Sequence, residues 1–394
     1  MHMFINALAA TAGGGLTYTR NVIPHLAAHS DVRVTAALCP NLAREFRDVP
    51  NVELLGLAMP AAQRFWHEQC VLPGLVRRSG ADVLLSAGNF ALRTSPVPQI
   101  LLSRNSIYTS PDFFRDLRSR GEYRMWVDTR LRAFLAKRSV SWADVTVAPS
   151  AAFAEELKRW TGAPVIAIHH GFDREAFTRD SCPLAPEVEG RFNAAGGCFK
   201  LLFVSHYNYY RNFETLIRAL PILRDRFACR PVKLLLTCNL VAGKNPGAYR
   251  PHTAASLVKT LGVSDMIVEL GAVPYQQLHQ IYARVDAYVS PAYTETFAHP
   301  LVEAMASGVP VVASDIAVHR EICDHAALYF ERYSPDHLAE RVMQIAERPE
   351  TRGPMVAKGL ERSSDFSWKA HVEQILELSR ALIHSAEHPS QTPQ

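Results

Sequence analysis

Short apolar runs alternate with stretches of helical periodicity along almost the whole chain, and this alternation constrains the fold more than any other feature. Strands that alternate with helices indicate a parallel sheet covered by helices on both faces. In the first half, the predicted strands are 3–9, 32–38, 52–57, 81–86, 99–103, 144–148 and 165–169. The main predicted helices there are 16–29, 113–139 and 151–160. We therefore expect a doubly wound α/β domain.

The second half repeats this pattern after a polar segment, 171–197, that has no sustained period and is predicted to be a linker and loop. Its predicted strands are 200–205, 232–237, 266–270, 286–290, 309–313 and 326–330. Its predicted helices are 212–227, 254–261, 275–283 and 300–307. Two doubly wound domains in tandem follow, each expected to bind ligands outside the carboxyl ends of its strands.

Composition narrows the class of protein. The chain has 394 residues, which at about 150 per domain favours two to three domains. Its net charge of +4 is too small to indicate nucleic-acid binding. The seven cysteines are scattered without metal-ligand spacing, which is typical of reduced thiols in a cytoplasmic protein. No apolar run reaches membrane-spanning length, and the first residues lack the basic flank of a signal peptide.

The most informative stretch is 295–315, ETFAHPLVEAMASGVPVVASD. Pro300 suits the first turn of a helix, and Gly308 suits the left-handed position just beyond its end. The backbone N–H groups of residues 296–298 are then expected at a helix N-terminus, which favours anions. Glu295 precedes this helix and Glu303 lies one turn inside it, among apolar residues, where a carboxylate without a partner is costly. We predict that both carboxylates reach one ligand; the alternative is two ordinary charged residues.

This stretch resembles the signature of the retaining glycosyltransferases of family 4, which have the GT-B fold. The signature is a glutamate, seven residues and a second glutamate, with an aromatic residue two positions after the first and a helix of small residues closed by glycine. The matching residues are Glu295, Phe297, Glu303, Ala304, Ala306, Gly308, Pro310 and Asp315, while Ala298 stands where the family has glycine. The resemblance implies that Glu295 binds donor-sugar hydroxyls and that Glu303 binds the nucleotide ribose. It places Thr296, Phe297, Ala298, His299 and Leu301 against the sugar and phosphates.

A second site of the family is a strand ending in Gly-Arg, followed five residues later by a lysine; these two cations hold the donor diphosphate. Here Arg211 stands at the lysine position, with Asn212 as the expected N-cap of the next helix, and His206 stands at the arginine position. Arg211 can bind phosphate oxygens in a bidentate way. His206 is either a pH-dependent partner, a plain hydrogen-bond donor, or directed away. A surface cation remains the alternative for Arg211.

Three glycines, Gly13, Gly14 and Gly15, join the first predicted strand to the first helix. A glycine loop there allows close backbone approach to a ligand. It fails the dinucleotide fingerprint, because Tyr18 stands at the third glycine position. The resemblance implies that Gly14 and Gly15 face the donor. Arg104 and Asn105 follow a strand and are predicted to bind the acceptor, the alternative being a pair that caps a loop.

The stretch 115–138 holds seven arginines and one lysine against three acidic residues, with Trp126, Leu131, Phe134 and Leu135 interleaved. Basic amphipathic helices of this kind bind membrane surfaces. The alternative, which we favour from sequence alone, is a solvated helix face packed on the sheet.

The resemblance covers nearly the whole chain. It implies an acceptor domain at 1–170 completed by a helix at 368–384, a hinge and loop at 171–198, a donor domain at 199–365 and a flexible tail at 385–394. The implied reaction is metal-independent transfer of a hexose-type sugar from a nucleotide diphosphate sugar to a hydroxyl, with retention and without a cofactor. The acceptor is a carbohydrate, a lipid-linked or a small molecule, in cell-envelope or polysaccharide biosynthesis, in the cytoplasm or at the inner face of the membrane. The alternative is a catalytically weak nucleotide-sugar-binding protein or partner subunit.

Overall fold

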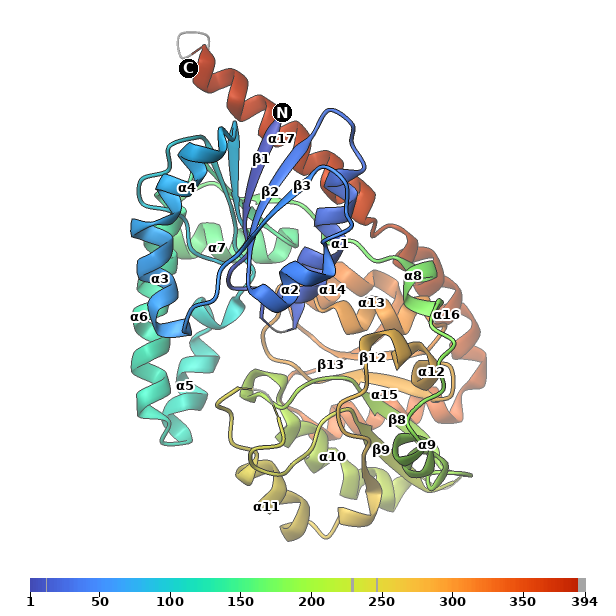
Figure 1. Ribbon diagram of the computed structural model, residues 1–394. Coiled ribbons are helices and arrows are strands. Elements are labelled where there is room, and N and C mark those ends of the chain that lie inside the picture. The colour runs from blue at the N-terminus through green and yellow to red at the C-terminus, as the bar shows by residue number, and fades with distance from the viewer. Residues whose placement is uncertain (12, 228–229, 246, 389–394) are drawn as a thin grey trace. The chain divides into compact units, whose positions relative to one another are not determined.

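The computed structural model describes residues 1–388 apart from 12, 228–229 and 246 (Figure 1). The chain divides into two compact units, which we describe separately. The first unit comprises Met1–Ser110, Leu117–Gly171 and Ser367–Gln394, and the second comprises Pro111–Asp116 and Phe172–Phe366.

The first unit is built on a parallel sheet with the strand order β3-β2-β1-β4-β5-β6-β7. The strands are β1 (His2–Asn6), β2 (Arg33–Leu38), β3 (Val52–Gly56), β4 (Val83–Ser86), β5 (Gln99–Leu102), β6 (Val145–Ala148) and β7 (Ile166–Ala167). The helices are α1 (Gly14–Ala27), α2 (Pro40–Glu45), α3 (Ala61–Cys70), α4 (Leu72–Ser79), η1 (Ser106–Tyr108), α5 (Pro111–Ser119, which begins in the second unit), α6 (Tyr123–Val140), α7 (Ala151–Thr161) and α17 (Trp368–Glu387).

The second unit repeats this order in the parallel sheet β10-β9-β8-β11-β12-β13. The strands are β8 (Phe199–Phe203), β9 (Val232–Leu236), β10 (Ile267–Glu269), β11 (Ala287–Ser290), β12 (Val311–Ser314) and β13 (Ala327–Phe330). The α-helices are α8 (Arg174–Thr178), α9 (Pro186–Asn193), α10 (Phe213–Arg226), α11 (His252–Thr260), α12 (Leu278–Tyr282), α13 (His299–Ala306), α14 (Ala317–Cys323), α15 (Pro335–Glu347) and α16 (Pro349–Ser364). The short turns are η2 (Tyr209–Arg211), η3 (Ser264–Met266), η4 (Tyr275–Gln277) and η5 (Asp324–Ala326).

The central strands of both sheets are buried on both faces, which explains their continuous apolar sequences. The last long helix, α17, packs on α1 in the first unit through Val372, Ile375 and Leu376. At its start, His371 Nδ1 lies 2.8 Å from the carbonyl oxygen of His169 and its Nε2 lies 3.2 Å from the hydroxyl of Tyr18. The prediction of two doubly wound parallel sheets is confirmed.

The single helix predicted over 113–139 is wrong, since the chain forms α5 and α6 with a turn between them. Gly121 adopts a left-handed conformation with φ of 71°, and its N–H donates to the carbonyl of Arg118 at 3.1 Å. A glycine in this conformation ends a helix, which the apolar period running through both helices concealed.

The segment 171–197, predicted to be a linker and loop, contains two helices that were not predicted. Asp173 caps α8 by accepting a hydrogen bond from the N–H of Ala176 at 2.9 Å, and Pro186 opens α9. Both helices are short, so their periodicity is weak in the sequence, but each buries apolar side chains such as Phe177 and Phe192. In the predicted tail, residues 385–387 continue α17, and 389–394 lie outside the described residues.

Candidate functional site

In the second unit, the strand order reverses direction between β8 and β11, so the loops after these two strands meet at the carboxyl edge of the sheet. Doubly wound sheets bind ligands at such a switch point. The loop after β8 carries His206 and Arg211, and the loop after β11 leads to Glu295. The topology alone therefore brings residues far apart in the sequence to one edge.

Hydrogen bonds between the two loops position Arg211. Asn208 accepts from the N–H of Arg211 at 3.2 Å and closes the turn η2. Asn212 follows in a left-handed conformation, and its amide donates to the carbonyl of Pro291 at 3.1 Å. Asn212 occupies the N-cap position of α10, but its side chain makes no capping hydrogen bond and instead ties the two loops together.

Arg211 and Glu295 form an ion pair from Nη1 to Oε1 at this edge. Both side chains are largely withdrawn from water, with exposed fractions of 16% and 9%. The Arg211 Nε is buried and has no hydrogen-bond partner among the described residues. A buried guanidinium with an unused donor beside a carboxylate is arranged to receive an acceptor oxygen, because an unpaired buried donor is otherwise costly.

Glu303 is buried inside α13 and does not contact Arg211. Its Oε2 accepts a hydrogen bond from the hydroxyl of Tyr282 at 3.1 Å (the same hydroxyl lies 3.3 Å from the carbonyl of Pro300). Burial raises the pKa of Glu303 to about 7, and the Tyr282 hydrogen bond opposes this shift. The carboxyl therefore titrates near neutrality, which is unusual for a structural residue.

The two ends of α13 differ. The C-terminal end has the backbone geometry that the sequence predicts, whereas the N-terminal end holds a residue in a strained conformation. Gly308 has φ of 70°, as expected for the residue beyond the helix. Ala298, at the N-cap, also lies in the left-handed region, with φ of 64°. The side chains of Phe297 and Leu301 are buried, and the Phe297 ring packs on Phe366. Phe297 and Leu301 can therefore contact a ligand only through their backbone. Thr296 and His299 are half-buried and lie nearer the surface.

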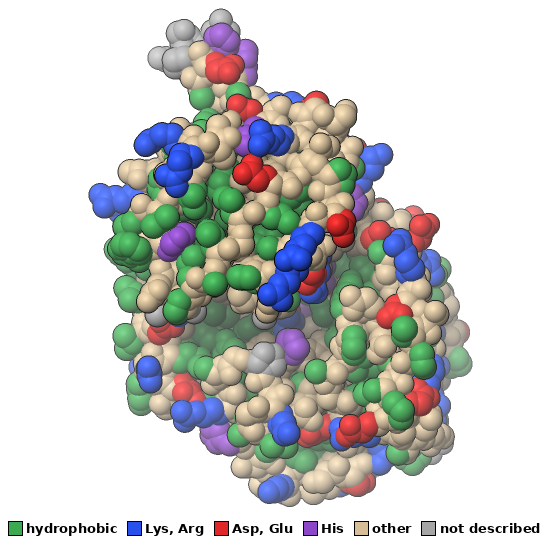
Figure 2. Space-filling view, viewed as in Figure 1, with side chains coloured by type: hydrophobic (Ala, Val, Ile, Leu, Met, Phe, Trp, Pro, Cys, Tyr) green, Lys and Arg blue, Asp and Glu red, His purple; other side chains and the backbone are tan. Residues whose placement is uncertain are grey.

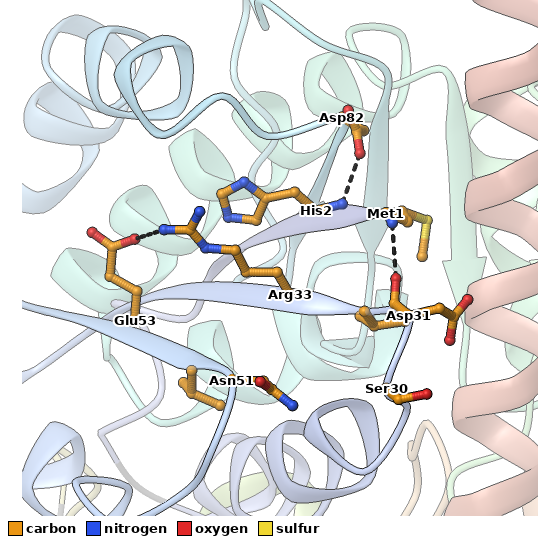
Figure 3. Close-up of a pocket in the computed structure, with 10 residues that line it drawn as sticks. Met1, His2, Ser30, Asp31, Arg33, Asn51, Glu53 and Asp82 are labelled. Atoms are coloured by element: carbon orange, nitrogen blue, oxygen red, sulfur yellow. Dashed lines mark hydrogen bonds and ion pairs between the residues drawn. The ribbon is translucent and has the colours of Figure 1, made fainter.

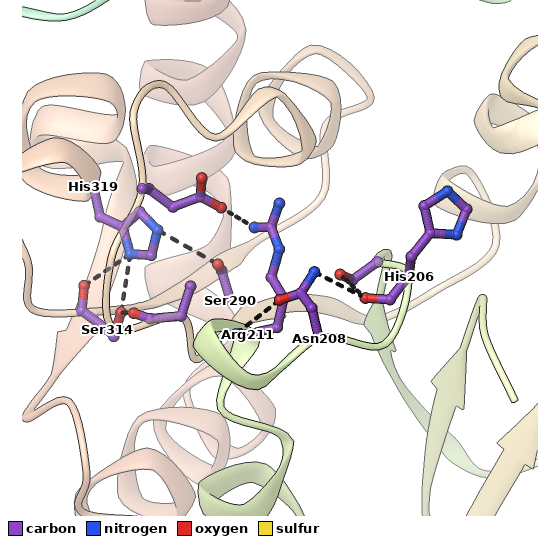
Figure 4. A network of polar contacts seen from close by, with 9 residues as sticks. His206, Asn208, Arg211, Ser290, Ser314 and His319 are labelled. Carbon is purple, nitrogen blue, oxygen red and sulfur yellow. Dashed lines mark hydrogen bonds and ion pairs between the residues drawn. The ribbon is translucent and has the colours of Figure 1, made fainter. Parts of the chain in front are cut away.

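His206 is exposed, and Figure 4 shows its imidazole ring directed away from the guanidinium of Arg211. Desolvation and the positive charge of Arg211 lower the pKa of His206 below its ordinary value. The lowered pKa disfavours the protonated ring, so His206 is a weaker cation than the arginine that the resemblance implies here.

Sequence reasoning missed a buried network behind Arg211 (Figure 4). His319, from α14, lies with Nδ1 3.0 Å from the carbonyl oxygen of Ser314 and with Nε2 3.5 Å from the hydroxyl of Ser290. The Ser314 hydroxyl in turn donates to the carbonyl of Ala292. Burial lowers the pKa of His319 to about 4, and the charge of Arg211 contributes to this. The network fixes the end of β11, from which the chain reaches Glu295.

In the first unit, the glycine loop and Arg104 lie together at the carboxyl edge of the sheet. Arg104 donates from Nη1 to the carbonyl of Gly14 at 2.8 Å and from Nε to the carbonyl of Ala87 at 3.1 Å. Its guanidinium also lies over the ring of Tyr18, with 5.5 Å to the centroid. Burial lowers the pKa of Arg104 to about 10, so it stays charged. Arg104 thus holds the glycine loop in place.

Two further polar residues border this edge. Asn105 caps η1 by accepting from the N–H of Ile107 at 3.4 Å, which agrees with the loop-capping alternative. Glu68, from α3, is buried and accepts from the amide of Asn6 at 3.3 Å, and burial raises its pKa to about 7. Glu68 was missed from the sequence, although a carboxylate on the buried side of an amphipathic helix is a signal that could have found it.

A hollow of about 630 Å³ lies at the opposite, amino edge of the first sheet (Figure 3). Two of the charges around it are paired, because Arg33 and Glu53 lie 3.1 Å apart. Asp82 accepts from the N–H of His2 at 2.7 Å. We assign no function to this hollow.

Among the described residues, no group of three or more His, Cys, Asp or Glu side chains could hold a metal ion. Within the same residues, no helix is both long and apolar enough to span a bilayer.

Two family models match the two halves of the chain. The model for glycosyl transferases group 1 matches residues 187–362, and the model for Glycosyltransferase Family 4 matches residues 12–176. A curated relative, D-inositol 3-phosphate glycosyltransferase of Corynebacterium aurimucosum, is 24% identical over 63% of this chain and 59% of its own length. The chain thus spans less than two thirds of that relative.

Solved structures with similar folds cover nearly the whole chain. Sucrose-phosphate synthase of Thermosynechococcus elongatus is 18% identical with a TM-score of 0.74 over 98% of this chain and 100% of its own. The Anabaena protein HepE in complex with UDP-glucose is 19% identical with a TM-score of 0.70 over 97% of this chain and 100% of its own. With the two doubly wound sheets, these likenesses identify the chain as a protein with the GT-B fold of the group 1 and family 4 type.

Proposed function

We propose that this protein is a glycosyltransferase that moves a hexose-type sugar from a nucleotide diphosphate sugar to a hydroxyl acceptor, with retention of anomeric configuration and without a metal. One observation carries the proposal: the buried Arg211, paired with Glu295 and with Nε unused, lies at the switch point of a sheet whose fold is that of glycosyltransferases. The similarity of HepE, which binds UDP-glucose, makes a UDP-sugar the first donor to test.

The reaction requires the bond between the anomeric carbon and the diphosphate to break while an oxocarbenium-like centre develops. The departing phosphate gains negative charge in the transition state, so groups that bind it more tightly there accelerate the step. Arg211 supplies a fixed cation with donors directed to phosphate oxygens. The N-terminus of α13 adds the positive end of a helix dipole, which also stabilises negative charge on the phosphate.

The two glutamates have separate roles in this proposal. Glu295, held by Arg211, orients the donor sugar through its hydroxyls, and it is not a nucleophile. Glu303 accepts hydrogen bonds from the nucleotide ribose, and a bound ribose favours its ionised form. In a same-face mechanism, the leaving phosphate takes the proton of the acceptor hydroxyl, so no protein base is needed. In the first unit, Gly14 and Gly15 offer their backbone to a ligand, and Arg104 holds this glycine loop.

A second candidate function is nucleotide-sugar binding with little transfer. The exposed His206, whose pKa is lowered, favours it, because a diphosphate leaving group then meets one permanent cation instead of two. Under this candidate, His206→Arg raises activity by restoring the missing charge.

The first test is a thermal-shift screen of wild type and Glu303→Gln against UDP, GDP, ADP and TDP sugars. A ligand that binds only the native state adds about RT ln(1 + [L]/Kd) to the free energy of unfolding and so raises the melting temperature. We expect one nucleotide class to raise it, and Glu303→Gln to abolish the shift. Nucleotide release is then measured with hydroxyl acceptors, D-inositol 3-phosphate among them. Binding without release favours the second candidate, and no shift with any sugar contradicts both.

A further inference from the structure

The helix α6 carries a row of apolar side chains that are exposed to solvent. Tyr123, Val127, Leu131 and Phe134 have exposed fractions of 66%, 59%, 59% and 60%. Their spacing of four, four and three residues places them within an arc of about 80° on the helix. We call these four residues the α6 stripe. Figure 2 shows hydrophobic side chains at the surface along the edge where α3 and α6 lie in Figure 1.

The helix buries a different face against its own unit. Its buried residues are Thr129, Ala133, Ala136, Ser139 and Val140, none of which belongs to the α6 stripe. A helix whose outer face is merely solvated carries polar residues on that face. The exposed Leu131 and Phe134 therefore favour a face that meets a partner over the solvated-face alternative.

Positive charge surrounds the α6 stripe. The helix holds five cations and one carboxylate. Arg124, Lys137 and Arg138 are exposed, and helical geometry places them within or beside the arc of the stripe. The one carboxylate, Asp128, projects from another side and is paired with Arg132 at 2.8 Å. The exposed face is therefore apolar along its middle and cationic at its borders.

We propose that the α6 stripe and its flanking cations dock the protein on an anionic lipid bilayer. A helix with this pattern lies in the interface plane, with its apolar face among the acyl chains and its cations against lipid phosphates. Lys and Arg suit this position because their aliphatic stems lie along the apolar layer while the charges reach the headgroups. Tyr123 is likewise suited, since its ring is apolar and its hydroxyl is polar.

The charges select this occupant over others. An apolar face that pairs with a second copy of itself would bring two sets of cations together, which is unfavourable. An anionic bilayer meets both components of the surface at once. The proposal does not rest on the donor chemistry, because the α6 stripe belongs to the first unit and its binding needs no nucleotide sugar.

The test is co-sedimentation of the full chain with vesicles of phosphatidylcholine alone and of phosphatidylcholine with phosphatidylglycerol. We expect binding to the anionic vesicles and little to the neutral ones. Arg124→Gln/Lys137→Gln/Arg138→Gln removes three cations and should weaken binding on the order of 100-fold. Leu131→Gln/Phe134→Gln should weaken it at least about 10-fold, because two apolar side chains no longer enter the acyl layer.

The matched control is Val241→Gln/Lys358→Gln, which changes an exposed apolar residue and an exposed cation in the second unit and should bind like wild type. Melting temperatures of all variants check folding. In about 1 M salt, where the Debye length is about 3 Å, residual binding should depend on the α6 stripe, Leu131 and Phe134 included, and no longer on the three cations. Failure of wild type to bind anionic vesicles overturns the proposal, as does equal binding by the variants. A concentration-dependent dimer lost in Leu131→Gln/Phe134→Gln, without vesicle binding, assigns the stripe to self-association instead.

Discussion

The sheets of the two units share one strand order apart from the additional edge strand β7 of the first, yet the loops at their switch points hold different groups. At the first switch point, Arg104 is satisfied by backbone carbonyls and supports a glycine loop. At the second, Arg211 is paired with Glu295 and keeps one buried donor unused. Topology thus fixes where a ligand can bind, whereas the loops decide whether an arginine is satisfied within the fold or keeps a donor unused.

The largest effect is expected from Arg211. Replacing it by alanine should lower the rate of sugar transfer by about 100-fold to 1000-fold, the range found when one group that stabilises a developing negative charge is removed. Arg211→Lys keeps the charge but loses the bidentate geometry, so its rate should lie between those of wild type and Arg211→Ala. The measurement is nucleotide release from the donor in the presence of acceptor.

The control for Arg211 is Lys358→Ala, an exposed cation on α16, which should leave the rate unchanged. Because Arg211→Ala also leaves Glu295 buried without its partner, folding is checked by the melting temperature, and Arg211→Ala/Glu295→Gln removes the unpaired charge. If a folded Arg211→Ala variant transfers sugar at the wild-type rate, the contrast between the two arginines fails.

The next effect concerns pH and Glu303. Its pKa is raised from 4.5 to about 7, so the folded protein keeps this proton to higher pH than the unfolded chain does. The resulting stability is fully present below pH 4.5 and is lost as the pH rises through 7, by up to about 3 kcal/mol. Glu303→Gln should flatten this dependence and be more stable than wild type at pH 8. Urea unfolding between pH 5 and 8 measures this pH dependence of the free energy of unfolding. A shift of one pKa unit corresponds to about 1.4 kcal/mol. An unchanged slope would assign the pH dependence to other groups.

The glycine loop gives an intermediate effect with a matched pair of variants. A Cβ at Gly15 would lie 3.0 Å from Arg104 Nη2 and 3.2 Å from Ala10 Cα, so Gly15→Ala should destabilise the protein by about 1 to 3 kcal/mol. A Cβ at Gly14 has no atom within 4 Å, and alanine favours the helix that starts there. Gly14→Ala should therefore be neutral or stabilising by up to about 1 kcal/mol. Equal melting temperatures for the two variants would show that Arg104 does not hold this loop closely.

Much of the fold could be predicted because buried parallel strands are continuous apolar runs and the helices between them are amphipathic. The break at Gly121 could not, because both flanking helices share one apolar period and only the backbone conformation distinguishes a helix end from a helix interior. The short helices α8 and α9 were missed because their burial depends on residues such as Tyr282 that are distant in sequence; the Phe177 ring lies 6.1 Å from that of Tyr282.

The site could be predicted only in part, for a related reason. The residues around Glu295 and Glu303 are local and form a recognisable motif. The pairing of Arg211 with Glu295 joins residues 84 positions apart, and the contact of His319 with Ser290 joins two elements of the sheet edge. Such contacts depend on strand order, which no local pattern encodes. The left-handed conformation of Ala298 was not predicted either, although the glycine that the family has at this position was a signal for it.

The smallest effect tests this last point within the site of the second unit. An L-residue in the left-handed region costs about 1 to 2 kcal/mol, which glycine does not incur. Glycine in turn lowers the free energy of unfolding by about 0.4 to 1 kcal/mol, because it gives the unfolded chain more conformational freedom. Ala298→Gly should therefore stabilise the protein by about 0.5 to 1 kcal/mol. Ala304→Gly, inside the same helix, should destabilise it by about 1 kcal/mol or more, because its φ needs no glycine. Opposite shifts of the urea midpoint would locate the strain at the N-terminus of α13, where the donor is proposed to bind, whereas shifts of the same sign would mean that Ala298 is not strained.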